Sequence, residues 1–176
     1  MNAASTAQER MDAAFENYFE LSNILQADMN ALLDSENDTQ HWRRNFIRAS
    51  ASLIEGYAHC LREMCAVSFE CVAPEIGVKD LKVLQSERGF DANERIKRTL
   101  RIACKLFQLE SAPNFGGNEW LRAQQILSKR HLLMHPKTLT DLDVPDELWN
   151  QMRDDVTWLM EQIFNVFSLL LQKYES

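Results

Sequence analysis

Apolar side chains recur at spacings of three and four residues through most of this chain, and very few residues interrupt the pattern. Glycine and proline together occupy only nine of the 176 positions. Because these two residues break helices, a chain with so few of them favours long helices. No stretch of useful length alternates apolar and polar residues as a half-buried strand would. The sequence therefore predicts an all-α fold.

The periodic segments and the polar runs between them divide the chain into helices. We predict helical segments over 8–33, 40–72, 79–86, 92–109, 118–134 and about 145–174. Asp38 or Thr39 is expected to cap the second segment, Pro74 to end it, and Asn118 to cap the fifth. The predicted architecture is an up-and-down bundle of four principal helices plus one short helix, forming a single domain over residues 1–176.

The cysteines and the N-terminal sequence indicate where such a chain works. A chain of this length can bury a core without disulfide bonds, and its four cysteines include no CxxC pair, so we expect reduced core thiols. The cysteines are Cys60, Cys65, Cys71 and Cys104. Neither a basic segment leading into an apolar run at the N-terminus nor eighteen consecutive apolar residues occur. We therefore expect a cytoplasmic protein that does not enter a membrane.

The net charge of −7 conceals an uneven distribution of charged residues. Residues 95–137 carry nine basic and two acidic side chains, whereas residues 1–40 carry one basic and eight acidic. The nine cations of this basic block are Arg95, Lys97, Arg98, Arg101, Lys105, Arg122, Lys129, Arg130 and Lys137. The block could attract a polyanion such as RNA. Alternatively, its cations pair with the acidic first and last helices, and charge alone does not decide between the two.

The segment LSKRHLLMHPK, residues 127–137, concentrates more chemistry than any other part of the chain. Histidine takes and gives a proton near neutral pH, and the planar fork of arginine fits phosphate oxygens. Arg130 and His135 lie about 140° apart on an ideal helix, so they can reach one phosphate only if the helix ends near His135. Pro136 favours that end. The apolar residues 132–134 are expected to anchor the segment in the core.

An arginine, a polar residue, three mostly apolar residues and a histidine, near the end of the helix before the last, resemble the motif of the HEPN superfamily. Here the motif reads Arg130-His131-Leu132-Leu133-Met134-His135. Family members with this motif are endoribonucleases that need no metal, often toxins or defence effectors, and they bring two motifs together in a homodimer. The resemblance thus implies a HEPN-like domain with RNA as its substrate and a second copy of itself as its partner.

The resemblance also implies roles for individual residues. His135 would be the general acid or base for attack of a ribose 2′-hydroxyl on the adjacent phosphate, leaving a 2′,3′-cyclic phosphate, and Arg130 would stabilise the transition state. His131, where the family commonly has asparagine, would orient the site or contact RNA, together with Lys129 and Lys137. The family places a polar residue from an earlier helix near the site, and Glu55 is the candidate.

The resemblance also suggests an antitoxin or other regulatory protein as a partner. In one branch of the family, a nucleotidyltransferase antitoxin modifies a tyrosine two residues after the histidine. Lys137 occupies that position here, so we do not expect that mode of regulation.

The sequence leaves two other kinds of function open. His131 and His135 have the i, i+4 spacing of zinc ligands, but Leu132 stands where an HExxH motif has its glutamate, and we predict neither a metal nor a cofactor. The second reading is a helical module that binds RNA, nucleotide or protein without catalysis.

The sequence also predicts where the four tryptophans lie. We expect Trp42, Trp120, Trp149 and Trp158 in the core rather than in a ligand-binding site. Trp149 lies beside the main apolar stripe of the last helix and could also contribute to a dimer surface.

Overall fold

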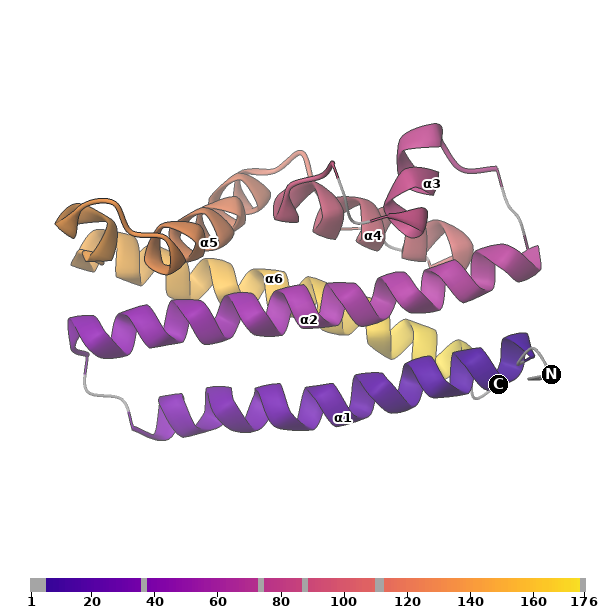
Figure 1. Cartoon of the computed structure of the whole chain (residues 1–176), viewed down its shortest axis with the longest axis horizontal. Helices are drawn as coiled ribbons and strands as arrows, with labels where there is room; N and C mark the ends of the chain where they lie inside the picture. The colour runs from indigo at the N-terminus through magenta and orange to yellow at the C-terminus, as the bar shows by residue number, and fades with distance from the viewer. Residues whose placement is uncertain (1–5, 36–37, 73–74, 87–88, 110–112, 175–176) are drawn as a thin grey trace.

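The computed structural model describes residues 6–35, 38–72, 75–86, 89–109 and 113–174, and within these ranges it contains helices and no strand (Figure 1). The elements are α1 (Ala7–Asp34), α2 (Gln40–Val72), α3 (Val78–Gln85), α4 (Ala92–Leu106), α5 (Asn118–Met134), the 3-10 helix η1 (Leu139–Leu142) and α6 (Asp146–Tyr174). The predicted all-α class is confirmed. The number of principal helices differs from the prediction, because five helices of at least 15 residues, not four, lie in the described ranges.

Local capping signals explain most of the helix ends. The Thr6 side chain accepts a hydrogen bond from the Glu9 amide at the start of α1, and Thr39 Oγ1 accepts one from the Trp42 amide at 3.2 Å. Thr39 therefore caps α2, and the Asp38 carboxylate instead accepts hydrogen bonds from Arg43. The prediction for α5 was wrong by one residue, because the chain is still extended at Gly117, which is the N-cap. Pro74 lies outside the described residues.

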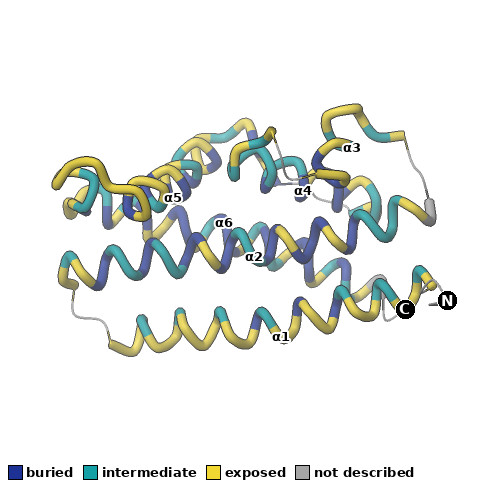
Figure 2. The backbone as a smooth tube through the Cα atoms, viewed as in Figure 1, coloured by how far each residue is buried: buried dark blue, intermediate teal, exposed yellow. Residues whose placement is uncertain are grey.

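Helix α2 is the centre of the bundle, because it packs against every other α-helix. Figure 1 shows α1 lying antiparallel along one side of α2, with α4 and α5 on the opposite side and α6 crossing behind. The buried positions of α2 follow helical spacing, and they include Ile47, Ala51, Ile54, Ala58, Leu61 and Cys65. Figure 2 shows burial along α2 and the inner faces of its neighbours, whereas α1 is mostly exposed.

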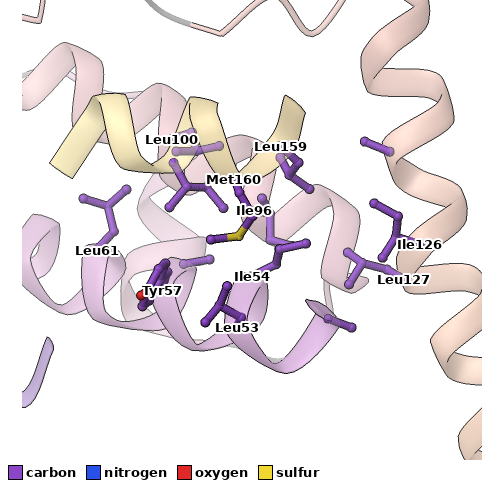
Figure 3. Close-up of a cluster of buried hydrophobic side chains, with 14 of the residues drawn as sticks. Leu53, Ile54, Tyr57, Leu61, Ile96, Leu100, Ile126, Leu127, Leu159 and Met160 are labelled. Carbon is purple, nitrogen blue, oxygen red and sulfur yellow. The ribbon is translucent and has the colours of Figure 1, made fainter. Parts of the chain in front are cut away.

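The main core lies where α2, α4, α5 and α6 meet. In Figure 3, Ile54 and Leu61 of α2 lie in one cluster with Ile96 of α4, Ile126 of α5 and Leu159 of α6. The cluster connects the middle of α2 to both helices on its far side, and it therefore fixes the position of α5 relative to α4. No helix of the described residues has the length and apolar character required to cross a membrane.

The cysteines whose side chains are described are reduced and buried, as predicted. Cys60, Cys65 and Cys104 are free thiols in the core. Burial raises the pKa of the Cys60 thiol to about 11, so the neutral form predominates at neutral pH. The side chain of Cys71 lies outside the described part of the structure.

Trp149 lies in the core, as expected, and the further suggestion that it contributes to a dimer surface was wrong. Its side chain is 3% exposed, and its ring lies edge-on to Trp42 and Phe46 at centroid distances of 5.2 and 5.0 Å. The start of α2 covers this position, which the periodicity of the last helix alone cannot reveal. Trp42 and Trp120 are buried and Trp158 is half-buried against the core, as expected.

We predict that Trp149→Ala lowers the free energy of unfolding by about 3–5 kcal/mol, because it leaves a cavity between α2 and α6. Urea denaturation followed by circular dichroism measures the change. The control is Ile24→Ala in the exposed part of α1, for which we expect a change within about 0.5 kcal/mol. Equal effects of the two substitutions would contradict the packing described for Trp149.

Candidate functional site

The predicted end of the helix near His135 is present in the structure. Helix α5 ends at Met134, and His135 is its C-cap with φ −131° and ψ 58°. The His135 amide donates to the carbonyl oxygen of His131 at 3.0 Å, which closes the last turn. The side chains of His131 and His135 are exposed, and their ring centroids lie 5.2 Å apart. The end of α5 thus presents two imidazoles at the surface.

Only one of the three apolar residues within the motif anchors it. Leu133 is buried, whereas Leu132 is 40% and Met134 is 49% exposed. The prediction that all three lock into the core was wrong, because successive residues point about 100° apart around a helix and only the middle one faces inward. Leu139, just after the motif, is 88% exposed. Three apolar side chains in the motif and just after it are therefore exposed.

Glu55 of α2 reaches the motif, as the sequence-based hypothesis expected. Its Oε2 atom lies 3.3 Å from Nη2 of Arg130, and both side chains are partly exposed. The pair links the middle of α2 to the last turn of α5 and limits the positions open to the Arg130 guanidinium. Because this ion pair orients the planar guanidinium of Arg130, it also sets the direction of the N–H donors that do not contact Glu55.

Arg130 and His131 line a pocket of about 430 Å³ between α2, α5 and the start of α4. Its other polar lining residues are Glu55, Asp91, Asn93 and Ser128. We call it the Arg130 pocket. His135 is not among its lining residues and lies one turn beyond His131. The structure therefore brings Arg130, His131 and Glu55 together, with His135 beside them at the helix end.

Asp91 and Asn93 were missed in the sequence analysis. Asp91 caps α4 by accepting a hydrogen bond from the Glu94 amide at 2.8 Å. An aspartate directly before a helical segment is a recognisable capping signal, but nothing local shows that the start of α4 lies beside the end of α5. Asn93 carries no such signal, and its place in the pocket follows only from the packing of α4 on α2.

Lys129 does not face the pocket, so the prediction that it binds substrate was wrong. The side chain is buried, and its Nζ atom donates to the carbonyl oxygens of Asp141 and Asp143 at 3.0 and 2.6 Å. Burial lowers the pKa of the Lys129 ammonium, and the carboxylates of Asp143 and Asp141 partly oppose this effect. Since it directly precedes Arg130, it points about 100° away around α5, toward the loop before α6.

The loop after the motif is held by several further hydrogen bonds. The Asp141 carboxylate accepts from the backbone amides of Lys137 and Thr138, both at 2.8 Å, and these bonds lower the pKa of Asp141. Arg48 of α2 donates to the carbonyl oxygen of Leu133 at 3.0 Å. The exit from α5 is therefore fixed on both sides of His135. The ammonium group of Lys137 is left exposed.

Most cations of the basic block have specific partners. Arg98 pairs with Asp80 and Glu94, and Arg122 pairs with Asp155 of α6 at 2.9 Å. Lys97 and Arg101 lie over the ring of Phe115. The alternative of ion pairing with the last helix is therefore found for Arg122, whereas Arg98 pairs with acidic residues of α3 and α4. The positive electrostatic potential of the basic block is therefore weaker than its count of nine cations suggests.

No group of three or more histidine, cysteine, aspartate or glutamate side chains that could hold a metal ion occurs in the described part of the chain. His131 and His135 therefore have no third protein ligand for a zinc ion among the described residues.

We predict that Lys129→Met lowers the free energy of unfolding by about 1–3 kcal/mol, because two loop carbonyl oxygens lose their donor. Hydrogen exchange of the amides in residues 137–144 should become faster as the loop loosens. Lys137→Met removes the same charge from an exposed side chain and should change stability by less than about 0.5 kcal/mol. Unchanged exchange in Lys129→Met would show that the ammonium does not hold the loop.

Comparison of the chain with protein-family models, with curated proteins and with solved structures gives no match. The chemistry of this site is therefore inferred from its own residues and their geometry.

Proposed function

We propose that this chain is a metal-independent endoribonuclease of the HEPN type, with Arg130 and His135 as its catalytic residues. One observation carries the proposal. Glu55 holds a half-buried Arg130 at the edge of a pocket, and an exposed His135 ends the same helix immediately before Pro136. A guanidinium held at a pocket and an accessible imidazole at the end of the same helix are the two kinds of group that cleavage of a phosphodiester requires.

In the proposed reaction, the imidazole of His135 accepts the proton of a ribose 2′-hydroxyl. The 2′-oxygen then forms a bond to the adjacent phosphorus, and the bond from phosphorus to the 5′-oxygen of the next nucleotide breaks. The leaving oxygen takes a proton, so the products are a 2′,3′-cyclic phosphate and a 5′-hydroxyl end. The Arg130 fork stabilises the negative charge that gathers on the phosphoryl oxygens in the transition state. DNA lacks the attacking hydroxyl and is not a substrate.

We further propose that the active form is a homodimer. One motif supplies one proton acceptor, whereas the reaction also needs a proton donor for the leaving oxygen, and a second copy of the motif supplies it. Leu132, Met134 and Leu139 are exposed apolar side chains at the surface where α5 ends and just beyond it. A two-fold contact through this surface would bury it and bring two motifs together. By the same resemblance, the proposal extends to a cytoplasmic toxin or defence effector controlled by a partner protein.

Cleavage of single-stranded RNA by the purified protein in the presence of EDTA tests the catalytic proposal. We expect cleavage to persist with the chelator and to fall by about 10²-fold or more in Arg130→Ala and in His135→Ala. His41→Ala is the control, since His41 is an exposed histidine at the start of α2 that does not line the Arg130 pocket. Loss of cleavage with EDTA, or equal rates in all variants, would contradict the proposal. Binding without cleavage would indicate the non-catalytic module.

Light scattering tests the dimer. We expect the mass of two chains for the wild type at micromolar concentration and the mass of one chain for the double variant Leu132→Glu and Leu139→Glu, because charges would enter the apolar surface. Ile24→Glu places the same charge on an exposed apolar position of α1 and should leave the mass at two chains. A wild-type mass of one chain would rule out this dimer.

A further inference from the structure

A second pocket adjoins the Arg130 pocket. It has a volume of about 460 Å³ and lies between α2 and the first half of α4, where His59, Arg62 and Arg95 line it. Glu55 and Ala92 line both pockets. The two pockets therefore adjoin along α2, and we call them together the groove. Helices α5 and α4, which contribute the other lining residues, succeed one another along α2 in Figure 1.

Of the three arginines that line this groove, two have a carboxylate partner. Glu55 opposes Arg130, and Glu63 opposes the buried Arg62 at 2.8 Å. The structure records neither an ion pair nor a side-chain hydrogen bond for Arg95 within the described ranges, and its side chain is half-buried. A half-buried guanidinium without an anion is held in place at a cost in solvation, and an anionic ligand would offset that cost. The far end of the groove thus has room and charge for one phosphate.

A second polar atom in the groove lacks a partner. Oδ1 of Asn93, in the Arg130 pocket, is buried and accepts no hydrogen bond from any described residue. Most buried acceptors in folded proteins have a donor, and a bound molecule that donates a hydrogen bond here would satisfy this one. A ribose hydroxyl or a base amino group beside the phosphate at Arg130 would provide that hydrogen. The groove therefore offers a sugar or base contact at one end and a phosphate contact at the other.

We propose that this groove binds two consecutive phosphates of a single RNA strand, the cleaved one at Arg130 and its neighbour at Arg95. The inference rests on the proposed ribonuclease function and assigns Arg95 as a substrate-binding residue outside the motif. Arg95 positions the strand so that the phosphate at Arg130 is presented to His135. It takes no part in the proton transfers.

Binding measurements in a His135→Ala parent test this assignment, because the RNA then stays intact. We expect an RNA trinucleotide with two internucleotide phosphates to bind about tenfold more tightly than a dinucleotide with one. Adding Arg95→Gln should abolish that gain and reduce the slope of log Kd against log salt concentration by about 0.7. Arg95→Lys should restore part of the gain. Arg101→Gln removes the same charge from an exposed position of α4 outside both pockets and should preserve the gain.

Cleavage by the otherwise native enzyme separates this inference from the function it rests on. With Arg95→Gln we expect KM to rise about tenfold while kcat stays within about twofold, since the contact is made equally before and during the reaction. Cleavage by the wild type with equal behaviour of Arg95→Gln and Arg101→Gln would overturn the inference alone. Binding that depends on Arg95 without wild-type cleavage would overturn the ribonuclease and retain the groove. Absence of both RNA binding and cleavage would overturn both.

Discussion

Guanidinium groups on the first half of α2 hold carbonyl oxygens at the end of α5 and near the end of the loop that leads to α6, and the rest of the site depends on these contacts. Arg48 donates to the Leu133 carbonyl, Arg44 to that of Leu142 at 3.1 Å, and Arg43 to that of Val144 at 2.9 Å. The last carbonyls of a helix have no partner within it, and cations are favoured at its negative end. Arg48 supplies both a hydrogen-bond donor and a positive charge to the end of α5, directly before Pro136. His135 is thereby held at a defined surface position.

The same side of α2 also forms the floor of the groove. Arg48, Ser52, Glu55, His59 and Arg62 follow one another at spacings of four and three residues, so they share one stripe of the helix. Arg48 fixes the end of α5, Glu55 contacts Arg130, and the remaining three line the pocket beneath α4. The buried positions of α2 named above each precede one of these residues or follow the last turn, so they lie about 100° away around the helix. A single long helix with one apolar and one polar stripe therefore determines both where α5 and α4 pack and what faces the space between them.

The features that depend on neighbours in sequence could be predicted, and those that depend on packing could not. The range of α2, the capping by Thr39 and the helix end before Pro136 each follow from periodicity or from the chemistry of adjacent residues. The surface role suggested for Trp149 and the binding role predicted for Lys129 were wrong because their partners lie far away, on the start of α2 and on the carbonyls of the loop before α6. Asn93 enters the site only because α4 packs beside α5. Glu55 could be proposed from the resemblance alone, and its contact with Arg130 needed the fold.

The pairing of arginines with carboxylates limits how this protein, which carries a net negative charge, could bind RNA. Arg98, Arg122 and Arg130 already face carboxylates, so their fields fall off within a short distance and contribute little to attraction from afar. Affinity in the proposed function must then come from contacts inside the groove, where a few donors act at close range and partly shielded from water. Such binding would depend less on salt than that of a protein with an open basic surface, because few counterions are released. It would also favour strands flexible enough to enter a groove, which single-stranded RNA is and a duplex is not.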